Sequence, residues 1–382
     1  MKTTKLLLVL FSILFCHYTQ AQEESDASPI TISGSVDAYF RTNLTAPNKG
    51  EYSPAPGTSF ANLPGFALGM ANVVAAYEGE KVGFVADLVF GPRGADAVFL
   101  STGSANIVNQ LYMYWTPVDR LTFTIGNFNT YLGYEVISPT GNFNYSTSYM
   151  FSSGPFSHTG LKADLALTDN WSLMAAVMNP TDYTDFNPLG TYTAGLQLGY
   201  ENDNGGTWLN LLYGDQDGKL DEDFDLSTGE TSAGTTFQVD LTTGYNVTDA
   251  LYLGLNATYL TTSAGEVYNG SAIIDADGDA AGFYGLAGYI QGSTSEKFSL
   301  GARLEYFSVF NDGGSAITTD PSSGDGNVFA LTLSGNIKPM KNLTLIPELR
   351  LDTASEESNF INRSLNPSKS LSSFLLAAVF SF

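Results

Sequence analysis

The chain ends in a segment, 375–382, in which larger apolar and small residues alternate up to a terminal Phe382. Successive side chains of a β-strand point to opposite faces, so this segment predicts a closing strand. A final strand that ends on an aromatic residue is typical of bacterial outer-membrane barrels, whose assembly machinery reads the terminal Phe. In such a barrel the apolar face of each strand lies outward against lipid, and the other face lines the lumen.

The amino end has the pattern of a secretory signal peptide. Lys2 and Lys5 precede an apolar stretch, 6–15, and small residues occupy the cleavage-determining positions up to Ala21. We expect cleavage after Ala21, so that residues 1–21 are removed. The mature chain then begins outside the cytoplasm, which agrees with the terminal strand.

The signal contains the only cysteine, so the mature chain has no disulfide and no thiol chemistry. Lipidation of Cys16 is disfavoured because Phe15 is too large just before a lipidated cysteine. Without Lys2 and Lys5 the chain has 14 basic residues against 39 acidic ones, a net charge of −25. We expect no nucleic-acid partner, because phosphate binding needs patches of Lys and Arg.

After the signal, no segment approaches the 18 or so uninterrupted apolar residues of a spanning helix. The chain is therefore a soluble β-protein or a membrane barrel. An open sheet is excluded in lipid, because its edges would leave backbone amide groups unpaired. The fold class that we predict is all-β, a transmembrane antiparallel β-barrel.

Alternation of apolar and polar residues recurs along the whole mature chain and predicts sixteen strands. Fourteen or eighteen strands remain alternatives, because strand boundaries are uncertain by a few residues. We expect a short periplasmic segment, 22–29, followed by a single barrel domain, 30–382. The predicted strands are 30–41, 66–78, 81–91, 107–117, 120–128, 157–167, 171–179, 191–201, 207–214, 234–246, 250–260, 281–291, 297–309, 327–338, 342–352 and 370–382.

The connections between these strands alternate strictly between long and short. This segregation is the pattern of a barrel with long external loops, short periplasmic turns and both termini in the periplasm. Sixteen strands also fall in the range that leaves an aqueous lumen. Two features fit less well: Pro347 inside a strand predicts a bulge, and Leu375 and Val379 would face the lumen.

The connection 129–156 is the longest of the set and contains Glu135 and Tyr145. In sixteen-stranded porins the corresponding loop folds inward and narrows the channel. We predict such a constriction, in which Glu135 favours cations, because long loops between rigid elements are usually functional or disordered. The alternative is an ordinary external loop over the barrel mouth.

Charged residues on the polar faces of the strands form a second group of candidates. Charge is costly against hydrocarbon but is tolerated in a wetted lumen, where it tunes selectivity. Neighbouring charges such as Arg303 and Glu305 could equally be structural pairs. The predicted pore-lining charges are Asp37, Arg41, Asp87, Lys162, Asp164, Asp240, Arg303, Glu305, Glu348, Arg350 and Asp352.

Catalysis has little support in the sequence. His158 is the only histidine of the mature chain, and Ser157 beside it points to the opposite face of the strand. We predict that His158 hydrogen-bonds the inward loop and that the protein is not an enzyme. The inward Tyr112 and Tyr114 could stack on sugars, although β-propensity also explains them.

Acidic clusters in the long connections lack the spacing of a dedicated calcium site. In the run 275–279 carboxylates alternate, but Ala280 stands where the calcium loop needs Gly and Leu286 where it needs the bidentate Glu. We expect no cofactor and no metal site. Loose binding of divalent cations, shared with lipopolysaccharide, is the most that these loops indicate.

Several short motifs together resemble the OmpL-like β-barrel porins, the second porin-type family, which is common in the Gram-negative Bacteroidetes. The resemblance covers most of the mature chain and implies a passive pore. The chain departs from the family at Asn127 and Thr147, where the family often carries basic residues, so any anion preference is weakened. The matching segments are ISGSVDAY (32–39), GNF (126–128), GYE (133–135), NFNYSTS (142–148), PFSHTG (155–160), ARLEYF (302–307) and PELRLD (347–352).

These observations predict an outer-membrane porin that passes small hydrophilic solutes by diffusion with a cation preference. The alternatives are a plugged barrel that serves as a structural anchor or surface-binding protein, a barrel enzyme, and a nutrient-specific channel. Expected partners are outer-membrane lipid, lipopolysaccharide and, through Phe382, the assembly machinery. The sequence leaves open whether the barrels form a homotrimer.

Overall fold

The computed structural model describes residues 30–49, 52–216, 235–263, 267–268, 271–272, 280–314 and 316–382. The expected signal peptide, 1–21, and the expected periplasmic segment, 22–29, lie outside these residues. Within the described ranges no helix has both the length and the apolar character needed to cross a bilayer.

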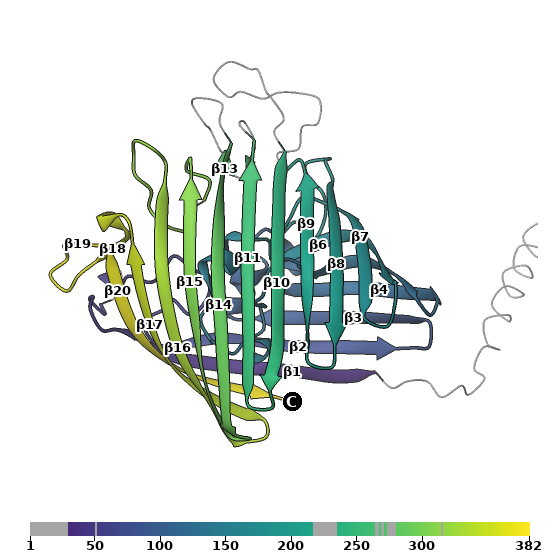
Figure 1. Cartoon of the computed structure of the whole chain (residues 1–382), viewed down its shortest axis with the longest axis horizontal. Helices are drawn as coiled ribbons and strands as arrows, with labels where there is room; N and C mark the ends of the chain where they lie inside the picture. Colours follow the sequence, from purple (N-terminus) through teal and green to yellow (C-terminus); the bar gives the residue numbers. More distant parts are fainter. Residues whose placement is uncertain are drawn as a thin grey trace, which may run out of the picture.

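The described strands form one closed antiparallel barrel of sixteen strands, in which each strand pairs with its neighbour in sequence and β20 pairs with β1 (Figure 1). The predicted fold class and strand number are confirmed. The ring consists of β1 (Thr31–Asn43), β2 (Gly65–Glu78), β3 (Val82–Phe90), β4 (Val108–Val118), β5 (Leu121–Asn129), β6 (Ser157–Ala166), β7 (Trp171–Met178), β8 (Thr193–Asn202), β9 (Gly205–Gly214), β10 (Thr236–Thr248), β11 (Leu251–Thr262), β14 (Ala281–Ser295), β15 (Phe298–Phe310), β16 (Gly326–Met340), β17 (Leu343–Ala354) and β20 (Ser370–Ser381).

Short elements lie in the connections. Two small hairpins pair β12 (Val267–Tyr268) with β13 (Ser271–Ala272) and β18 (Phe360–Ile361) with β19 (Pro367–Ser368). The helical pieces are α2 (Pro92–Ala97), η2 (Gly103–Ile107), η3 (Pro139–Gly141), α3 (Tyr149–Ser153) and η4 (Glu357–Asn359).

The two faces of each strand differ as the alternation predicts. In β1, Val36 is 52% exposed on the outside, whereas the neighbouring Ser35 and Asp37 are buried inside. In β4, Leu111 and Met113 are likewise exposed on the outside. An apolar outer wall and a more polar inner wall follow from this one period-2 pattern.

Long connections join the strands at one end of the barrel, and tight turns such as 203–204, 249–250 and 341–342 join them at the other. We call these the loop end and the turn end. β1 begins and β20 finishes at the turn end, which is the lower end of β10 and β11 in Figure 1.

The predicted bulge at Pro347 is wrong. β17 keeps one register with β20 through Pro347, and its register with β16 is the same on both sides of that residue. The register places Gly335 of β16 opposite Pro347, and no backbone pairing joins these two residues. The strand therefore accommodates the missing N–H by a local gap in the ladder without an extra residue.

Candidate functional site

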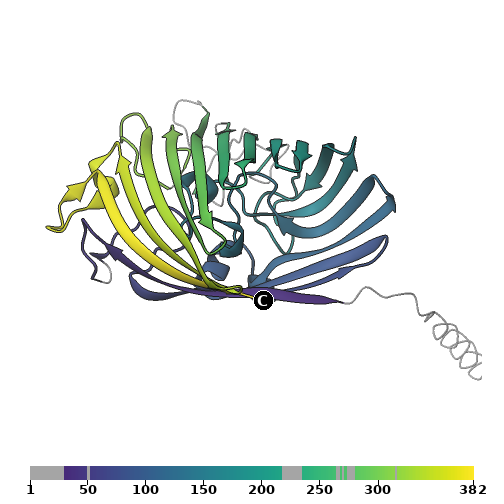
Figure 2. The same ribbon diagram turned by 60° about the horizontal axis from the view of Figure 1, so that its bottom comes forward.

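The connection between β5 and β6, residues 130–156, lies inside the barrel. Figure 2 shows short segments enclosed by the ring of strands. Tyr145 donates its backbone N–H to Glu348 of β17, and Tyr149 donates its own to Glu305 of β15, on strands far from β5 and β6 in the ring. We call residues 130–156 the inward loop.

Carboxylates of the barrel wall hold the backbone of the inward loop. Glu348 accepts the N–H groups of residues 145–146 at 2.9 and 3.3 Å, one on each carboxylate oxygen. Glu305 accepts those of residues 149–150 at 3.0 and 2.9 Å in the same way. An irregular segment lacks the backbone hydrogen bonds of a sheet, so its buried N–H groups need other acceptors, and these carboxylates provide them. Hydrogen bonds to an ionised acceptor are also stronger than neutral ones.

Arginines hold the carbonyl groups of the same segment. Arg303 donates to the Ser146 carbonyl at 2.7 Å and to the Thr147 carbonyl at 3.2 Å. Arg350 donates to the Thr147 carbonyl at 2.8 Å and pairs with Asp352 at 3.0 Å. Residues 145–150 are therefore fixed on both sides of the peptide chain by charged side chains.

Glu135 belongs to the loop itself and forms a buried ion pair with Arg303. Its other carboxylate oxygen accepts the Ser148 N–H at 2.7 Å. Arg303 thus pairs with a residue of the inward loop and not with Glu305, the partner that the sequence suggested. Glu305, two residues along β15, accepts amides of the loop. The charge of Glu135 is balanced within this site.

Tyr145 joins the loop to the seam where β1, β17 and β20 meet. Its hydroxyl donates to Asp37, which also accepts the Met70 N–H at 3.1 Å. Its ring belongs to a buried apolar cluster that includes Leu375 and Val379. The predicted inward orientation of these two β20 residues is confirmed, and each is only 4% exposed.

Arg93 of α2 is a functional candidate that the sequence did not single out. It donates to the Ile137 carbonyl at 2.8 Å and to the Tyr145 carbonyl at 3.2 Å, and its guanidinium lies 4.4 Å from the Phe60 ring centroid. A lone arginine in a loop next to a strand carries no pattern that predicts this contact. It ties the connection after β3 to the inward loop.

The other predicted pore-lining residues fall into two groups. Asp240 accepts the Gly133 N–H at 3.0 Å, Asp87 accepts from Asn109 at 2.6 Å, and Arg41 donates to the Pro54 carbonyl at 3.0 Å. These three, like Asp37, Arg303, Glu305, Glu348, Arg350 and Asp352, are at most 5% exposed. Whether any of them lines an open pore stays a prediction.

Lys162 and Asp164 differ from this buried group. They form an ion pair at 3.0 Å with side chains 26% and 40% exposed on the inner wall of β6. Tyr112, on the inner face of β4, packs against the cluster of Phe128 and Met174. Tyr114 lies nearer the turn end of β4, beside Gly83.

His158 is fully buried, and its Nε2 lies 2.9 Å from the Thr130 hydroxyl of the inward loop. The predicted hydrogen bond between this histidine and the loop is confirmed. The carboxyl end of the loop is fixed by Asp182, which accepts the N–H groups of Phe156 and Ser157 at 2.7 and 3.0 Å. Burial raises the pKa of Asp182, which lies in the β7–β8 connection, to about 7.

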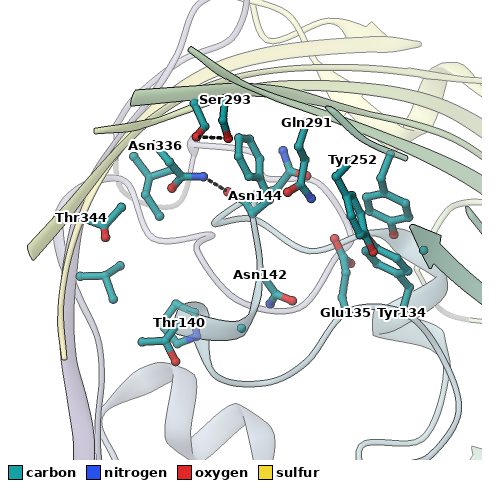
Figure 3. A pocket seen from close by; sticks show the side chains of 18 of the residues that line it. Tyr134, Glu135, Thr140, Asn142, Asn144, Tyr252, Gln291, Ser293, Asn336 and Thr344 are labelled. Carbon is teal, nitrogen blue, oxygen red and sulfur yellow. Dashed lines mark hydrogen bonds between the residues drawn. The ribbon is translucent and has the colours of Figure 1, made fainter. Parts of the chain in front are cut away.

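Beyond the loop, the turn-end half of the lumen is hollow. A cavity of about 710 Å³ lies between the inward loop and the wall formed by β9–β11, β14–β17 and β20. We call it the vestibule. In Figure 3, Gln291, Asn336 and Thr344 come from the wall, whereas Tyr134, Thr140 and Asn142 come from the loop. By contrast, a space beside Asp240 and Met150 measures only about 10 Å³, at or below the volume that about one water molecule needs.

Among the described residues no group of three or more His, Cys, Asp or Glu side chains is arranged to hold a metal ion. The acidic runs 217–225 and 275–279, in which loose divalent binding is expected, lie outside the described residues.

Solved outer-membrane proteins share this barrel fold. The fold resembles the outer membrane channel DcaP of Acinetobacter baumannii, with 14% identity, TM-score 0.58 and coverage of 94% of this chain and 99% of that one. It also resembles the trimer form of OmpT from Vibrio cholerae (13% identity, TM-score 0.55, 94% and 100% covered) and an anion-selective porin from Comamonas acidovorans (10%, 0.56, 93% and 99%).

No curated protein sequence matches the chain significantly. A sequence model of the family described as "Putative beta-barrel porin-2, OmpL-like" matches residues 29–382. The match spans nearly all of the chain and includes both the strands of the barrel and the inward loop. The chain therefore belongs to the OmpL-like beta-barrel porin-2 family of the outer membrane.

Proposed function

We propose that this porin passes small hydrophilic solutes by passive diffusion and that the inward loop is the barrier they cross. The observation that carries the proposal is the clamp on residues 145–150, whose backbone is held across the lumen by Glu305, Glu348 and Arg303. In an aqueous channel, a segment that leaves the wall at β5 and β6, lies inside the lumen and is held at β15 and β17 sets the size of what passes.

The predicted cation preference needs a different source from the one inferred from sequence. The inward carboxylates at the clamp are buried and balanced by arginines and loop amides, so they present little net charge to water. Acidic residues in the connections at the loop end, such as Asp312, Asp320 and Asp325, support a cation bias in that mouth. We keep the preference as a proposal on that support.

The test is a conductance measurement in planar lipid bilayers. We expect small steps for the wild type and steps several-fold larger for the double variant Glu305→Gln/Glu348→Gln. Each carboxylate accepts one N–H on each of its two oxygens, and in Gln the NH₂ group, a donor, replaces one of these oxygens. A reversal potential in a potassium chloride gradient measures the ion preference. A Lys297→Gln variant, changed in an exposed turn, is the matched control.

A plugged barrel that acts as an anchor or a surface-binding protein is the second candidate. It is favoured by the burial of the held loop residues Tyr145, Thr147 and Tyr149, each at most 1% exposed, and by the small size, about 10 Å³, of the space beside Asp240. If the wild type and the double variant are both folded and neither conducts ions in bilayers, the plugged barrel would be supported and the pore rejected.

The remaining expectations on placement are proposals as well. We infer that the turn end faces the periplasm, since the short turns, the start of β1 and the end of β20 lie there, and that lipopolysaccharide surrounds the loop end. The trimer form of OmpT makes a homotrimer a reasonable assembly for this chain. Protease access to a tag inserted at 203–204 in intact cells tests the orientation.

A further inference from the structure

We propose that the vestibule is a binding site for an acidic saccharide, a sugar ring that carries a carboxylate. This assignment rests on the proposed pore, because it names the class of solute that would occupy the turn-end half. Three properties of the cavity carry it: flat aromatic surfaces, unpartnered polar groups and an excess of positive charge.

The aromatic surfaces lie flat on the wall because glycines face them. A Cβ atom at Gly206 would lie 2.4 Å from the indole of Trp208, and one at Gly254 would lie 2.6 Å from the Tyr134 hydroxyl. At such distances a larger side chain would displace the ring from its place, so each glycine makes room for a ring to rest on the sheet. A ring seated in this way can present its free face to the cavity.

Two further rings repeat this arrangement along the vestibule. Phe143 would contact a Cβ atom at Gly301 at 2.4 Å, and Tyr252 occupies the space over Gly244. The Tyr252 and Tyr134 hydroxyls are hydrogen-bonded at 2.8 Å (Figure 3). The C–H face of a pyranose ring packs on aromatic faces of this kind, whereas an inorganic anion is not attracted to them, because the face of the ring is negative.

Polar groups around these rings lack protein partners. Within the described residues, the side chains of Gln291 and Thr344 form no hydrogen bond, and the Tyr289 hydroxyl is unpartnered although that side chain is only 5% exposed. Asn336 uses its amide nitrogen on the Phe143 carbonyl at 3.1 Å, which leaves its oxygen free. Amide and hydroxyl groups at the edge of aromatic surfaces match the hydroxyls of a sugar.

The charge of the vestibule is positive. Lys338 and Lys341 line it, and neither forms an ion pair with any described residue. The one acidic side chain of the lining, Glu135, is held by Arg303. Two unpaired ammonium groups in a chain that is acidic overall mark a place where a carboxylate gains attraction. A neutral sugar would not use them.

Intrinsic fluorescence tests the proposal directly. Of the three tryptophans, Trp115 and Trp171 are exposed on the outer wall and Trp208 lines the vestibule. In a Trp115→Phe/Trp171→Phe background, in a detergent without a sugar headgroup, D-glucuronate is expected to change the Trp208 emission at lower concentration than glucose or acetate. Calorimetric titration of the unmodified protein repeats the comparison without these substitutions.

The charge contribution is tested by Lys338→Ala/Lys341→Ala, which should weaken glucuronate about tenfold, a typical effect for two charge-assisted contacts, and leave glucose unchanged. Lys297→Ala, outside the lining, is the control. Gln291→Ala should weaken both sugars. If glucuronate binds no more tightly than glucose and acetate, or if the lysine variant binds it equally well, the proposal is overturned.

Binding in detergent does not depend on passage through a membrane. If the protein binds glucuronate but does not conduct ions in bilayers, the proposed pore would be rejected and the binding site supported. Conductance without glucuronate binding would do the reverse.

Discussion

The two halves of the lumen are built from the same strands but differ in what their inner faces carry. Towards the loop end, β15 and β17 present Arg303, Glu305, Glu348 and Arg350, all buried against the inward loop. Towards the turn end, β17 presents Thr344 to a cavity of about 710 Å³. We call the loop-end half, which the inward loop occupies, the filled half. Its charged side chains bind the backbone of the loop and are not exposed to water in the lumen.

The difference has a physical reason. The inward loop has only short helical pieces, so its amide and carbonyl groups need partners from outside the segment. Leaving such groups unpaired in a water-excluded interior costs about 1–3 kcal/mol each. Charged side chains on a rigid wall satisfy two groups at once, as Glu305 and Glu348 do. The inward loop borders the turn-end half without filling it, so a cavity of about 710 Å³ remains there.

The largest effect is expected from Arg303→Met, which keeps the bulk of the side chain and removes its charge. Glu135 then becomes an unpaired buried carboxylate, and breaking a buried pair in this way costs about 3–5 kcal/mol. We expect that loss in the free energy of unfolding, together with larger conductance steps as the loop loosens. Urea unfolding in lipid vesicles and bilayer recording measure the two. An unchanged stability would mean that the filled half is not held as described.

Asp182 binds the carboxyl end of the inward loop and should make the free energy of unfolding depend on pH. Its pKa is raised from 3.8 to about 7, so between these values the folded protein holds a proton that the unfolded chain releases. Stability should therefore rise as the pH falls from about 8 to 5, by up to about 1.4 kcal/mol per unit of pKa shift.

The Asp182→Asn variant should abolish that pH dependence and be the more stable protein at pH 8. Asparagine tolerates the positive φ of 68° at this position and keeps an oxygen for the Phe156 and Ser157 amides. Unfolding midpoints at several pH values measure the effect. Parallel pH profiles for the two proteins would rule out Asp182 as its source.

Tyr145→Phe removes one hydrogen bond at the seam and should have an intermediate effect. Asp37 keeps the Met70 amide but loses the phenol donor, which costs about 1–3 kcal/mol for a buried acceptor. Hydrogen exchange of residues 145–150 should become faster while the barrel strands keep their protection. Tyr114→Phe, on the wall of β4, is the matched control.

The sequence predicts the barrel well because one period of two residues determines each strand and its faces. The inward orientation of Asp37, Glu305 and Glu348 follows from that period alone. Their loop partners do not follow from it. The Tyr145 hydroxyl donates to Asp37 and amides of 145–150 donate to the two glutamates, and these groups belong to an irregular loop about 110 to 200 residues away along the chain. A charge that faces a lumen looks the same in sequence whether water or a folded loop covers it.

The vestibule was missed for a related reason. Lys338 shares the inward face of β16 with Ser334, so its position could have been found from the same alternation. Trp208 and Gln291 also lie on inward faces, but only the closed ring brings β9, β14 and β16 around one cavity. An inner glycine was a further signal, because Gly254 alternates with the apolar Leu253 and Leu255.

The smallest effect is expected from Lys162→Met, the counterpart of Arg303→Met outside the clamp. Lys162 and Asp164 are paired at 3.0 Å, as closely as Arg350 and Asp352, but their side chains are 26% and 40% exposed. Water and salt screen such a pair, so its loss should change the free energy of unfolding by about 0–1 kcal/mol. The same urea titration used for Arg303→Met measures it. If the two substitutions lower the free energy of unfolding equally, the burial of charge under the inward loop does not distinguish the two halves. A difference of several kcal/mol would show that the stabilising charges are those that hold the inward loop.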